Sequence, residues 1–568
     1  MAHRVRTETT HERRPRHTVS ARRTKTRKRR ARPPARPQRT APAAPAEAPA
    51  DLARRYLVYV VIAMAVAAAL LSILAIQRYR DYYGGRFDMG NMVQAVYNTA
   101  HGHFLEVTSS DAAGRQMSRL GAHVDPILAV FAIPWLVWPS PMMLLIAQAV
   151  IVSLAAWPAY RLGLRVLGDA RAAFLLAVAL LLYPPLQYAA LNEFHPVTLA
   201  IPFLLFAFVY ADEGRWWRAA PFLVLAALCK EEIPLVIGVM GLYFAWRTRS
   251  WRPLLVTALA AAYFVVAVKI VLPHFSPGGS PFLNRYADLG SSVGGVGANV
   301  VLKPGVTLSH LFATSNLHYL LQLLWPFAFT SLLSPLTTLI AAPEFILNAL
   351  ASNGFQRSYE FHYVAGEVPF IFAGAVLGIA RLRSWLTRGR RTRAAAATWA
   401  SIGTLATVVL ATTLVANFFL GPLPFSLPGA HYSGKSYAVK GHAKVLDMAL
   451  KLIPSAGNVT VSTENDAGSR LSARRVVYTF PTIKNAQWVV VDTTAPDVYD
   501  HYDALGHSQA LGALVLNQDY RSVYARDGVY VFKRVTGAAP APAGQVAPSP
   551  TATPRVQVTS SATSSIAP

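Results

Sequence analysis

The sequence predicts an α-helical polytopic membrane protein with about eleven transmembrane helices and a small extracytoplasmic α/β domain near its C-terminal end. Composition predicts the membrane class, because 53% of the 568 residues are hydrophobic and only 14% are charged. Soluble domains usually carry about 25% charged residues. Many apolar runs approach or exceed the roughly 18 residues that mark a membrane-spanning helix. Short β-branched runs after Phe419 predict the α/β domain.

Residues 1–55 form a basic segment rich in proline and alanine, without periodic apolar residues. They hold 17 Lys and Arg against 4 Asp and Glu, a net charge of +13 within the chain's total of +26. Such a composition predicts disorder. No apolar core of a cleavable signal peptide precedes Tyr56. We expect a cytoplasmic tail that contacts anionic membrane lipids, with nucleic acid or ribosome contact as the less favoured alternative.

The predicted transmembrane domain covers residues 56–420, and its first span runs from Tyr56 to Ile76. Basic clusters recur between later apolar runs, at Arg161–Arg171, Arg215–Arg218, Arg247–Arg252 and Arg381–Arg393. Positively charged loops stay in the cytoplasm, so the polar loops between these clusters are expected outside. The chain should therefore be a multi-pass plasma-membrane protein with its N-terminus in the cytoplasm and its C-terminus outside.

Two regions of this domain depart from simple spans. The first outer loop, residues 77–140, is unusually long and contains an apolar stretch, Ile127 to Trp138, that is too short to cross a bilayer. We expect an interfacial or re-entrant helix there. Between Leu317 and Leu350 three prolines interrupt the apolar pattern, which predicts two short helices.

The expected extracytoplasmic domain covers residues 421–535. The runs "VTVST", "RRVVYTF" and "WVVVDTT" predict strands, and "VYARDGVYVF" predicts a hairpin that turns at Asp527–Gly528. Helical periodicity lies between the strands, at His442–Leu452 and Ala504–Leu514. Residues 536–568 are rich in Ala, Pro, Ser and Thr, a composition that predicts a disordered tail.

Ionisable residues gather at the predicted outer face or inside helices. The candidates for a substrate site are Asp88, His123, Asp125, Glu193, His195, Lys230, Glu231, Glu232, Glu344 and His362. Ionisable groups at membrane depth are costly, so they usually form pairs or serve a pathway or a site. Each has a structural alternative: a solvated loop position, an ion pair of Lys230 with Glu231 or Glu232, or a helix cap by Glu344. Several loops offering such groups at one interface favour a shared cavity.

The cofactor requirement stays open. Histidine and carboxylate side chains bind divalent cations, so a metal ion is one option. The spacing of the candidates matches no known metal signature, however, and the sequence contains no P-loop, GxSxG or HExxH motif.

Several motifs occur in a specific order: "FDMGNMVQAVYNTAHG", "HVDPI", "NEFHPV", "KEE", "APEFILNALAS" and "FHY". Together they resemble a family of bacterial and archaeal membrane proteins known as domain of unknown function 2079, over residues 86–534. That family is similar in architecture to the GT-C class of glycosyltransferases, which take sugars from polyprenyl-phosphate carriers. Members of the class place an essential acidic residue in the first outer loop, and Asp88 matches this position. Met89 follows it, where some GT-C enzymes carry a second acidic residue.

The resemblance implies a glycosyltransferase that moves a sugar from a polyprenyl-phosphate carrier to an extracytoplasmic acceptor, with Asp88 as general base. Lys230, His195 and His123 are of the right type to face the leaving phosphate. One alternative is a transporter or lipid flippase that uses Lys230, Glu231, Glu232 and Glu344 as a pathway. Another is a scaffold whose outer domain recruits partners. For Asp88 itself, the alternative is a cap on a helix that begins near Met89.

Overall fold

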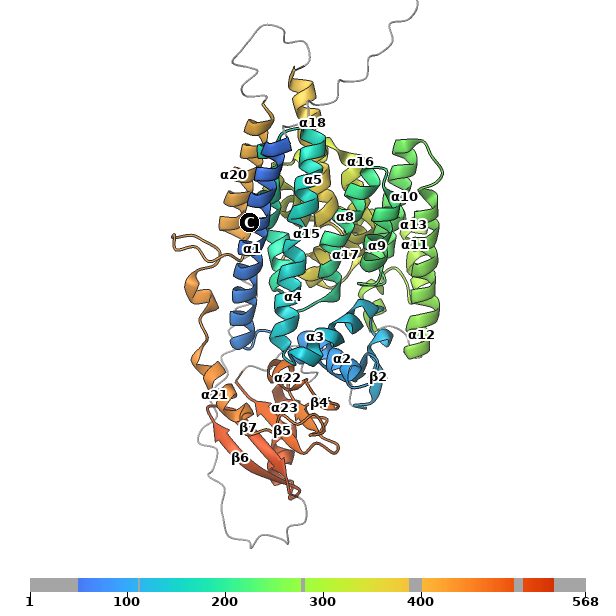
Figure 1. Cartoon of the computed structure of the whole chain (residues 1–568). Coiled ribbons are helices and arrows are strands. Elements are labelled where there is room, and N and C mark those ends of the chain that lie inside the picture. Colours follow the sequence, from blue (N-terminus) through green and yellow to red (C-terminus); the bar gives the residue numbers. More distant parts are fainter. Residues whose placement is uncertain (1–49, 111–112, 277–280, 388–400, 495–503, 536–568) are drawn as a thin grey trace, which may run out of the picture. The chain divides into compact units, whose positions relative to one another are not determined.

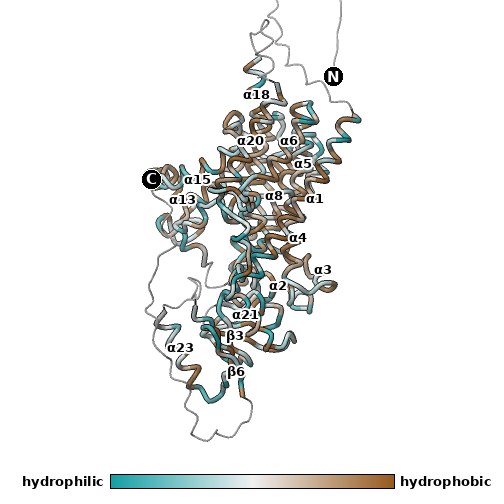
Figure 2. Tube along the Cα trace, turned by 90° about the vertical axis from the view of Figure 1, so that its left-hand side faces the viewer, coloured by the Kyte–Doolittle hydropathy of each residue, from teal (hydrophilic) through white to brown (hydrophobic). Residues whose placement is uncertain are grey.

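The computed structural model describes residues 50–110, 113–276, 281–387, 401–494 and 504–535. Most of the predicted N-terminal tail and the tail of residues 536–568 therefore lie outside the described residues. Within them the chain is mainly helical, with one larger sheet near the C-terminal end (Figure 1). Figure 2 shows that hydrophobic residues dominate α1, α4 and α5, as expected for a membrane-embedded protein.

Five helical segments of the described residues are long and apolar enough to cross a membrane. They are α1 (Ala50–Arg80), α4 with α5 (Pro141–Leu167), α11 to α12 (Leu254–Phe275), α18 (Val368–Thr387) and α20 (Ile402–Leu420). The pair α6 (Ala170–Leu181) and α7 (Pro184–Leu191) passes the same test but bends by 46°, and it makes a sixth if counted as one span. The predicted first span lies within α1.

This count by length and composition is lower than the predicted number of about eleven spans, because many apolar runs are broken into shorter helices. Proline and polar residues make the breaks: Pro184 begins α7 after the bend, and the segment Lys230–Glu232 separates two helices. The shorter apolar segments are Pro126–Val137, Pro196–Asp212, Ile233–Thr248, Val293–Leu302 and Pro335–Leu350. The remaining helices of the domain are α2 (Asn91–Ala100), α3 (Ala132–Val137), α8 (Ala200–Asp212), α9 (Trp216–Ala227), α10 (Ile233–Thr248), α13 (Val293–Leu302), α14 (Pro304–Leu311), α15 (Thr314–Leu324), α16 (Pro335–Thr338) and α17 (Ala342–Leu350).

The segment between α1 and α4 contains the expected short apolar helix. A 3-10 segment, Pro126–Phe131, leads into α3, whose residues Ile133 and Val137 are 71% and 88% exposed. The same segment also contains a small antiparallel pair, β1 (Glu106–Thr108) and β2 (Gln116–Ser118). Such exposed apolar side chains on a short helix suit an interfacial position.

The C-terminal sheet confirms the α/β reading of the sequence. Its strands are β3 (Val461–Thr463), β4 (Val477–Thr479), β5 (Trp488–Asp492), β6 (Tyr520–Arg526) and β7 (Val529–Arg534), in the order β4-β3-β5-β7-β6. The first three are parallel, whereas β7 is antiparallel to β5 and β6. Its helices are α21 (Gly441–Leu450), α22 (Asn465–Leu471) and α23 (Ala504–Leu516). The hairpin turns where predicted, with positive φ at both Asp527 and Gly528.

Candidate functional site

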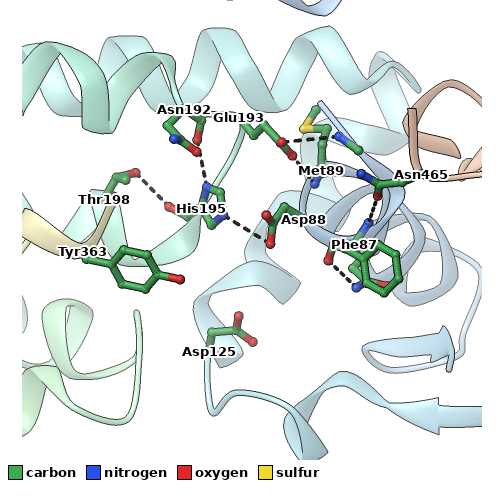
Figure 3. A network of polar contacts seen from close by, with 12 residues as sticks. Phe87, Asp88, Met89, Asp125, Asn192, Glu193, His195, Thr198, Tyr363 and Asn465 are labelled. Atoms are coloured by element: carbon green, nitrogen blue, oxygen red, sulfur yellow. Dashed lines mark hydrogen bonds and ion pairs between the residues drawn. The ribbon is translucent and has the colours of Figure 1, made fainter. Parts of the chain in front are cut away.

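Asp88 lies in a short π-helical turn, Arg86–Gly90, that leads directly into α2. Gly84 enters this turn with φ 138°, a conformation that favours glycine. The N–H groups of Gly85 and Met89 donate hydrogen bonds to the Glu193 carboxylate, at 3.3 and 2.7 Å. Figure 3 shows Glu193 against this turn. The capping role that was the alternative for Asp88 is therefore filled by Glu193.

His195 is the direct partner of Asp88. Its Nε2 atom lies 3.6 Å from Asp88 Oδ1, while its Nδ1 atom is 2.8 Å from the carbonyl oxygen of Asn192 (Figure 3). Because a carbonyl only accepts, Nδ1 carries a proton and Nε2 is the atom that faces Asp88. The His195 ring also stacks on His362, with ring centroids 3.6 Å apart. The imidazole is thus held on two sides while one nitrogen points at the carboxylate.

The pKa values of Asp88 and Glu193 are shifted in opposite directions. Partial removal from water raises the pKa of Asp88, but the nearby His195 imidazole and the charge of Arg119 outweigh this, so its pKa lies below the ordinary value. Burial, followed by the negative charge of Asp88, raises the pKa of Glu193 to about 8. Two neighbouring carboxyls with diverging pKa values are typical of sites that need one ionised carboxylate.

A cavity of about 560 Å³ opens beside Asp88, whose side chain is 49% exposed to it. Segments that are distant in the sequence form its walls: the loop after α1, the start of the Pro196 turn, the end of α9, and the segment before α18. Six of the predicted site residues line it: Asp88, His123, Asp125, His195, Lys230 and His362. Figure 3 shows Asp88, Asp125 and Tyr363 around a common space.

Two further predicted residues, Glu231 and Glu232, contact residues of the cavity wall. Glu231 accepts hydrogen bonds from His123 Nδ1 at 2.8 Å and from the Val124 N–H at 2.9 Å. Glu232 forms an ion pair with Lys230, whose Nζ atom is 2.6 Å from Oε1. Each of these carboxylates therefore fixes a residue that faces the cavity.

Glu344 lies elsewhere. It is buried in α17 with its carboxylate against Gly366, so close that a Cβ at that glycine would collide with Oε2. It is not part of the cavity wall.

Sequence reasoning missed three residues of the cavity wall, Arg119, Arg285 and Tyr363. Arg119 donates from Nε and Nη2 to Asp125 Oδ2, at 3.0 and 2.7 Å, and both side chains are buried. Arg285 and Lys230 both lie over the Tyr363 ring, at 5.9 and 5.4 Å from its centroid. Tyr363 ends the "FHY" motif, which was the signal that could have found it, whereas Arg119 and Arg285 had only their position in loops predicted to lie outside.

The cavity wall holds both a carboxylate, Asp88, and cationic side chains, Lys230 and Arg285. Asp88 can accept a proton, and the cations Lys230 and Arg285 can bind an anionic group such as a phosphate. Among the described residues, no three His, Cys, Asp or Glu side chains are grouped so that they could hold a metal ion. The option of a divalent cation thus has no preformed protein site in that part of the chain.

Comparisons with known proteins agree with the membrane assignment. Residues 78–531 match the family described as predicted membrane protein (DUF2079). Comparison with curated proteins gives no significant match. Among solved structures, the chain is similar to ArnT from Cupriavidus metallidurans in the apo state, with 14% identity over 84% of this chain and 98% of that one and a TM-score of 0.46.

It is also similar to the arabinofuranosyltransferase AftD from Mycobacteria, with 15% identity over 84% of this chain and 40% of that one and a TM-score of 0.42. Such scores describe a partial resemblance in the arrangement of helices and assign no activity to this chain. The family match, in contrast, extends over most of the sequence and includes all the residues of the cavity wall. The chain therefore belongs to the DUF2079 family of predicted membrane proteins.

Proposed function

We propose that this protein is a membrane glycosyltransferase that moves a sugar from a polyprenyl-phosphate carrier to an extracytoplasmic acceptor. The observation that carries the proposal is the placement of Asp88, which faces a cavity of about 560 Å³ whose wall also holds Lys230 and Arg285. A glycosyl transfer from a lipid phosphate needs both kinds of group in one space, a base for the acceptor and cations for the phosphate.

Asp88 acts as the general base in this proposal. The acceptor hydroxyl attacks the anomeric carbon and loses its proton to Asp88, while the bond between that carbon and the phosphate oxygen breaks. The lowered pKa of Asp88 keeps the carboxylate ionised and ready to accept a proton. His195 orients the carboxylate through Nε2, and Glu193 holds the turn that carries it. General-base catalysis of this kind contributes roughly 10²–10⁴-fold to the rate.

Lys230 and Arg285 receive the leaving phosphate. Negative charge grows on the phosphate oxygen as the glycosidic bond breaks, and cations in a partly water-excluded site stabilise that charge. Glu232 and Tyr363 fix the position of Lys230, and Gln356 lies 3.3 Å from Arg285 Nη1. His123, held by Glu231, also lines the cavity and is the third donor in this proposal.

The test is a transfer assay with purified protein, a polyprenyl-phosphate-linked sugar and an acceptor extract. Asp88→Asn preserves the shape but cannot take the proton, so transfer should fall roughly 10²–10⁴-fold while carrier binding stays nearly unchanged. Asp288→Asn is the matched control, because Asp288 is an exposed carboxylate that does not line the cavity. Full activity of Asp88→Asn would refute the assignment of the base.

One observation favours the second candidate, a transporter or lipid flippase. Glu344 is buried and its Oε2 atom has no hydrogen-bond partner among the described residues, while nearby Glu367 accepts hydrogen bonds from Tyr319 and Asn348 at 2.8 and 2.9 Å. Buried carboxyls within a helical domain can form a proton pathway. A proton flux into liposomes that Glu344→Gln abolishes, together with intact Asp88→Asn activity, would favour this function over the transferase.

A further inference from the structure

The C-terminal α/β domain packs directly against the turn that carries Asp88. Helix α22 lies so close to this turn that side chains are excluded at three glycines. A Cβ at Gly85 would lie 2.2 Å from Asn465, one at Gly90 would lie 2.7 Å from Ser472 Oγ, and one at Gly468 would collide with Arg86. The glycines of the "YYGGRFDMGN" motif thus permit a backbone approach between two segments far apart in the sequence.

Polar contacts fix this approach at defined atoms. The buried Arg86 guanidinium donates to the carbonyl oxygens of Thr108 and Val477, the latter in β4. Gln94 of α2 donates to the Arg475 carbonyl oxygen at 3.1 Å, and Arg475 forms an ion pair with Glu106 at 2.7 Å. Burial of an arginine against two carbonyls is stable only while the second segment stays in place.

One contact reaches the peptide next to Asp88. The Phe87 N–H donates to Oδ1 of Asn465 at 3.0 Å (Figure 3). Met89, on the other side of Asp88, donates its N–H to Glu193 at 2.7 Å. The N–H groups of both residues flanking Asp88 are therefore held, one by the membrane domain and one by the α/β domain.

The Asn465 side chain faces this turn from the first residue of its own helix. It is the first residue of α22 and only 5% exposed, and the cap position before it, Glu464, makes no capping side-chain hydrogen bond. Asn is a strong acceptor for the free N–H groups at a helix start. Here it supplies that acceptor to the start of another helix.

We propose that Asn465 is a positioning residue for Asp88, so that the α/β domain completes the active site by docking on its turn. This inference rests on the proposed function. It gives the α/β domain a role in the chemistry, because the domain sets the direction of the base.

The hydrogen bond from the Phe87 N–H to Asn465 can be tested without an activity assay. Hydrogen–deuterium exchange of the full-length protein in nanodiscs is measured on peptides that cover residues 84–92. Asn465→Ala removes the acceptor for the Phe87 N–H, so exchange in these peptides should accelerate roughly five-fold, the change that loss of a helix-capping acceptor produces. Asn465→Asp retains an oxygen acceptor and should restore the protection. Unchanged exchange in folded Asn465→Ala would overturn the inference.

Asn517→Ala is the matched control. Asn517 accepts the Asp519 N–H at 2.9 Å in an exposed loop of the same domain, so its loss should leave residues 84–92 unchanged. Faster exchange at 84–92 in this control as well would overturn a specific role of Asn465. If Asn465→Ala does not fold, Asn465→Gln keeps the amide but displaces its oxygen, and the same acceleration is expected.

Transfer activity gives the second readout. A displaced base should lower kcat roughly ten- to hundred-fold in Asn465→Ala, with an unchanged KM for the polyprenyl-phosphate-linked sugar and recovery in Asn465→Asp. An Asn465→Ala variant with faster exchange but wild-type kcat would overturn the positioning role. If the wild-type protein transfers no sugar, the proposed function fails. The exchange experiment still decides whether Asn465 holds the Phe87 N–H.

Discussion

Replacement of Glu193 by glutamine tests the electrostatic design of the site. Glu193 accepts hydrogen bonds from two backbone N–H groups of the Asp88 turn. The negative charge of the nearby Asp88 raises the pKa of Glu193. Glutamine has the same shape but no charge, and it keeps only one oxygen acceptor. The variant should therefore change stability in opposite directions at low and at high pH.

The size of the change in the free energy of unfolding follows from the pKa of Glu193, which is raised from 4.5 to about 8. Above pH 4.5 the unfolded chain releases the proton, whereas the folded chain keeps it until about pH 8. Because the unfolded state then binds fewer protons, wild-type stability falls as the pH rises through this window. The full loss is at most about 5 kcal/mol and is complete above pH 8.

Glutamine removes this loss but leaves one N–H without its acceptor, which costs about 1 kcal/mol. The variant should be less stable than the wild type at pH 5 and more stable at pH 9. Fluorescence-detected melting of the detergent-solubilised proteins at both pH values measures this, with Glu360→Gln as control for a side chain that is 40% exposed. Parallel melting curves for wild type and Glu193→Gln across the pH range would refute the reasoning.

Three further predictions concern the cavity and the topology. Lys230→Gln should weaken binding of a polyprenyl-phosphate carrier roughly ten-fold or more, since a charge-assisted contact to phosphate is lost, whereas Lys444→Gln in α21 should not; carrier titration by intrinsic fluorescence measures both. His195→Ala removes the partner that lowers the Asp88 pKa, so the acid limb of the pH profile of kcat/KM should move to higher pH; an unmoved limb would mean that Asp88 is not the titrating base. A reporter fused after Phe419 should read extracytoplasmic and one fused after Arg391 cytoplasmic, and a cytoplasmic signal after Phe419 would contradict the placement of the site outside.

Much of the candidate site could be predicted because membrane topology limits where polar loops can meet. His123, His195, Lys230 and His362 lie in loops that the basic clusters assign to one side, and all four line one cavity. The strands after Phe419 and the hairpin at Asp527 were readable from β-branched runs and turn chemistry. Local sequence patterns of this kind are sufficient to predict short strands and turns.

Contacts between distant segments could not be predicted. The Phe87 and Asn465 pair is separated by 378 positions, and nothing around Asn465 marks it as the acceptor for a helix start. Arg119 and Arg285 are ordinary loop arginines until the fold places them beside Asp125 and Tyr363. The bend of 46° between α6 and α7 was not predicted either, because hydropathy does not show that a new helix begins at Pro184.

The separation between Phe87 and Asn465 has a consequence for biogenesis. A ribosome adds roughly 5–20 residues per second, so some tens of seconds pass between synthesis of the Asp88 turn and synthesis of the segment that completes it. During that time α1 and the following helices can insert, while the Phe87 N–H still lacks its acceptor. A nascent chain therefore carries a membrane domain whose Asp88 turn lacks its contact with Asn465. Under the proposed function, competence for transfer arises only after the α/β domain that carries Asn465 has been made and has folded against the Asp88 turn.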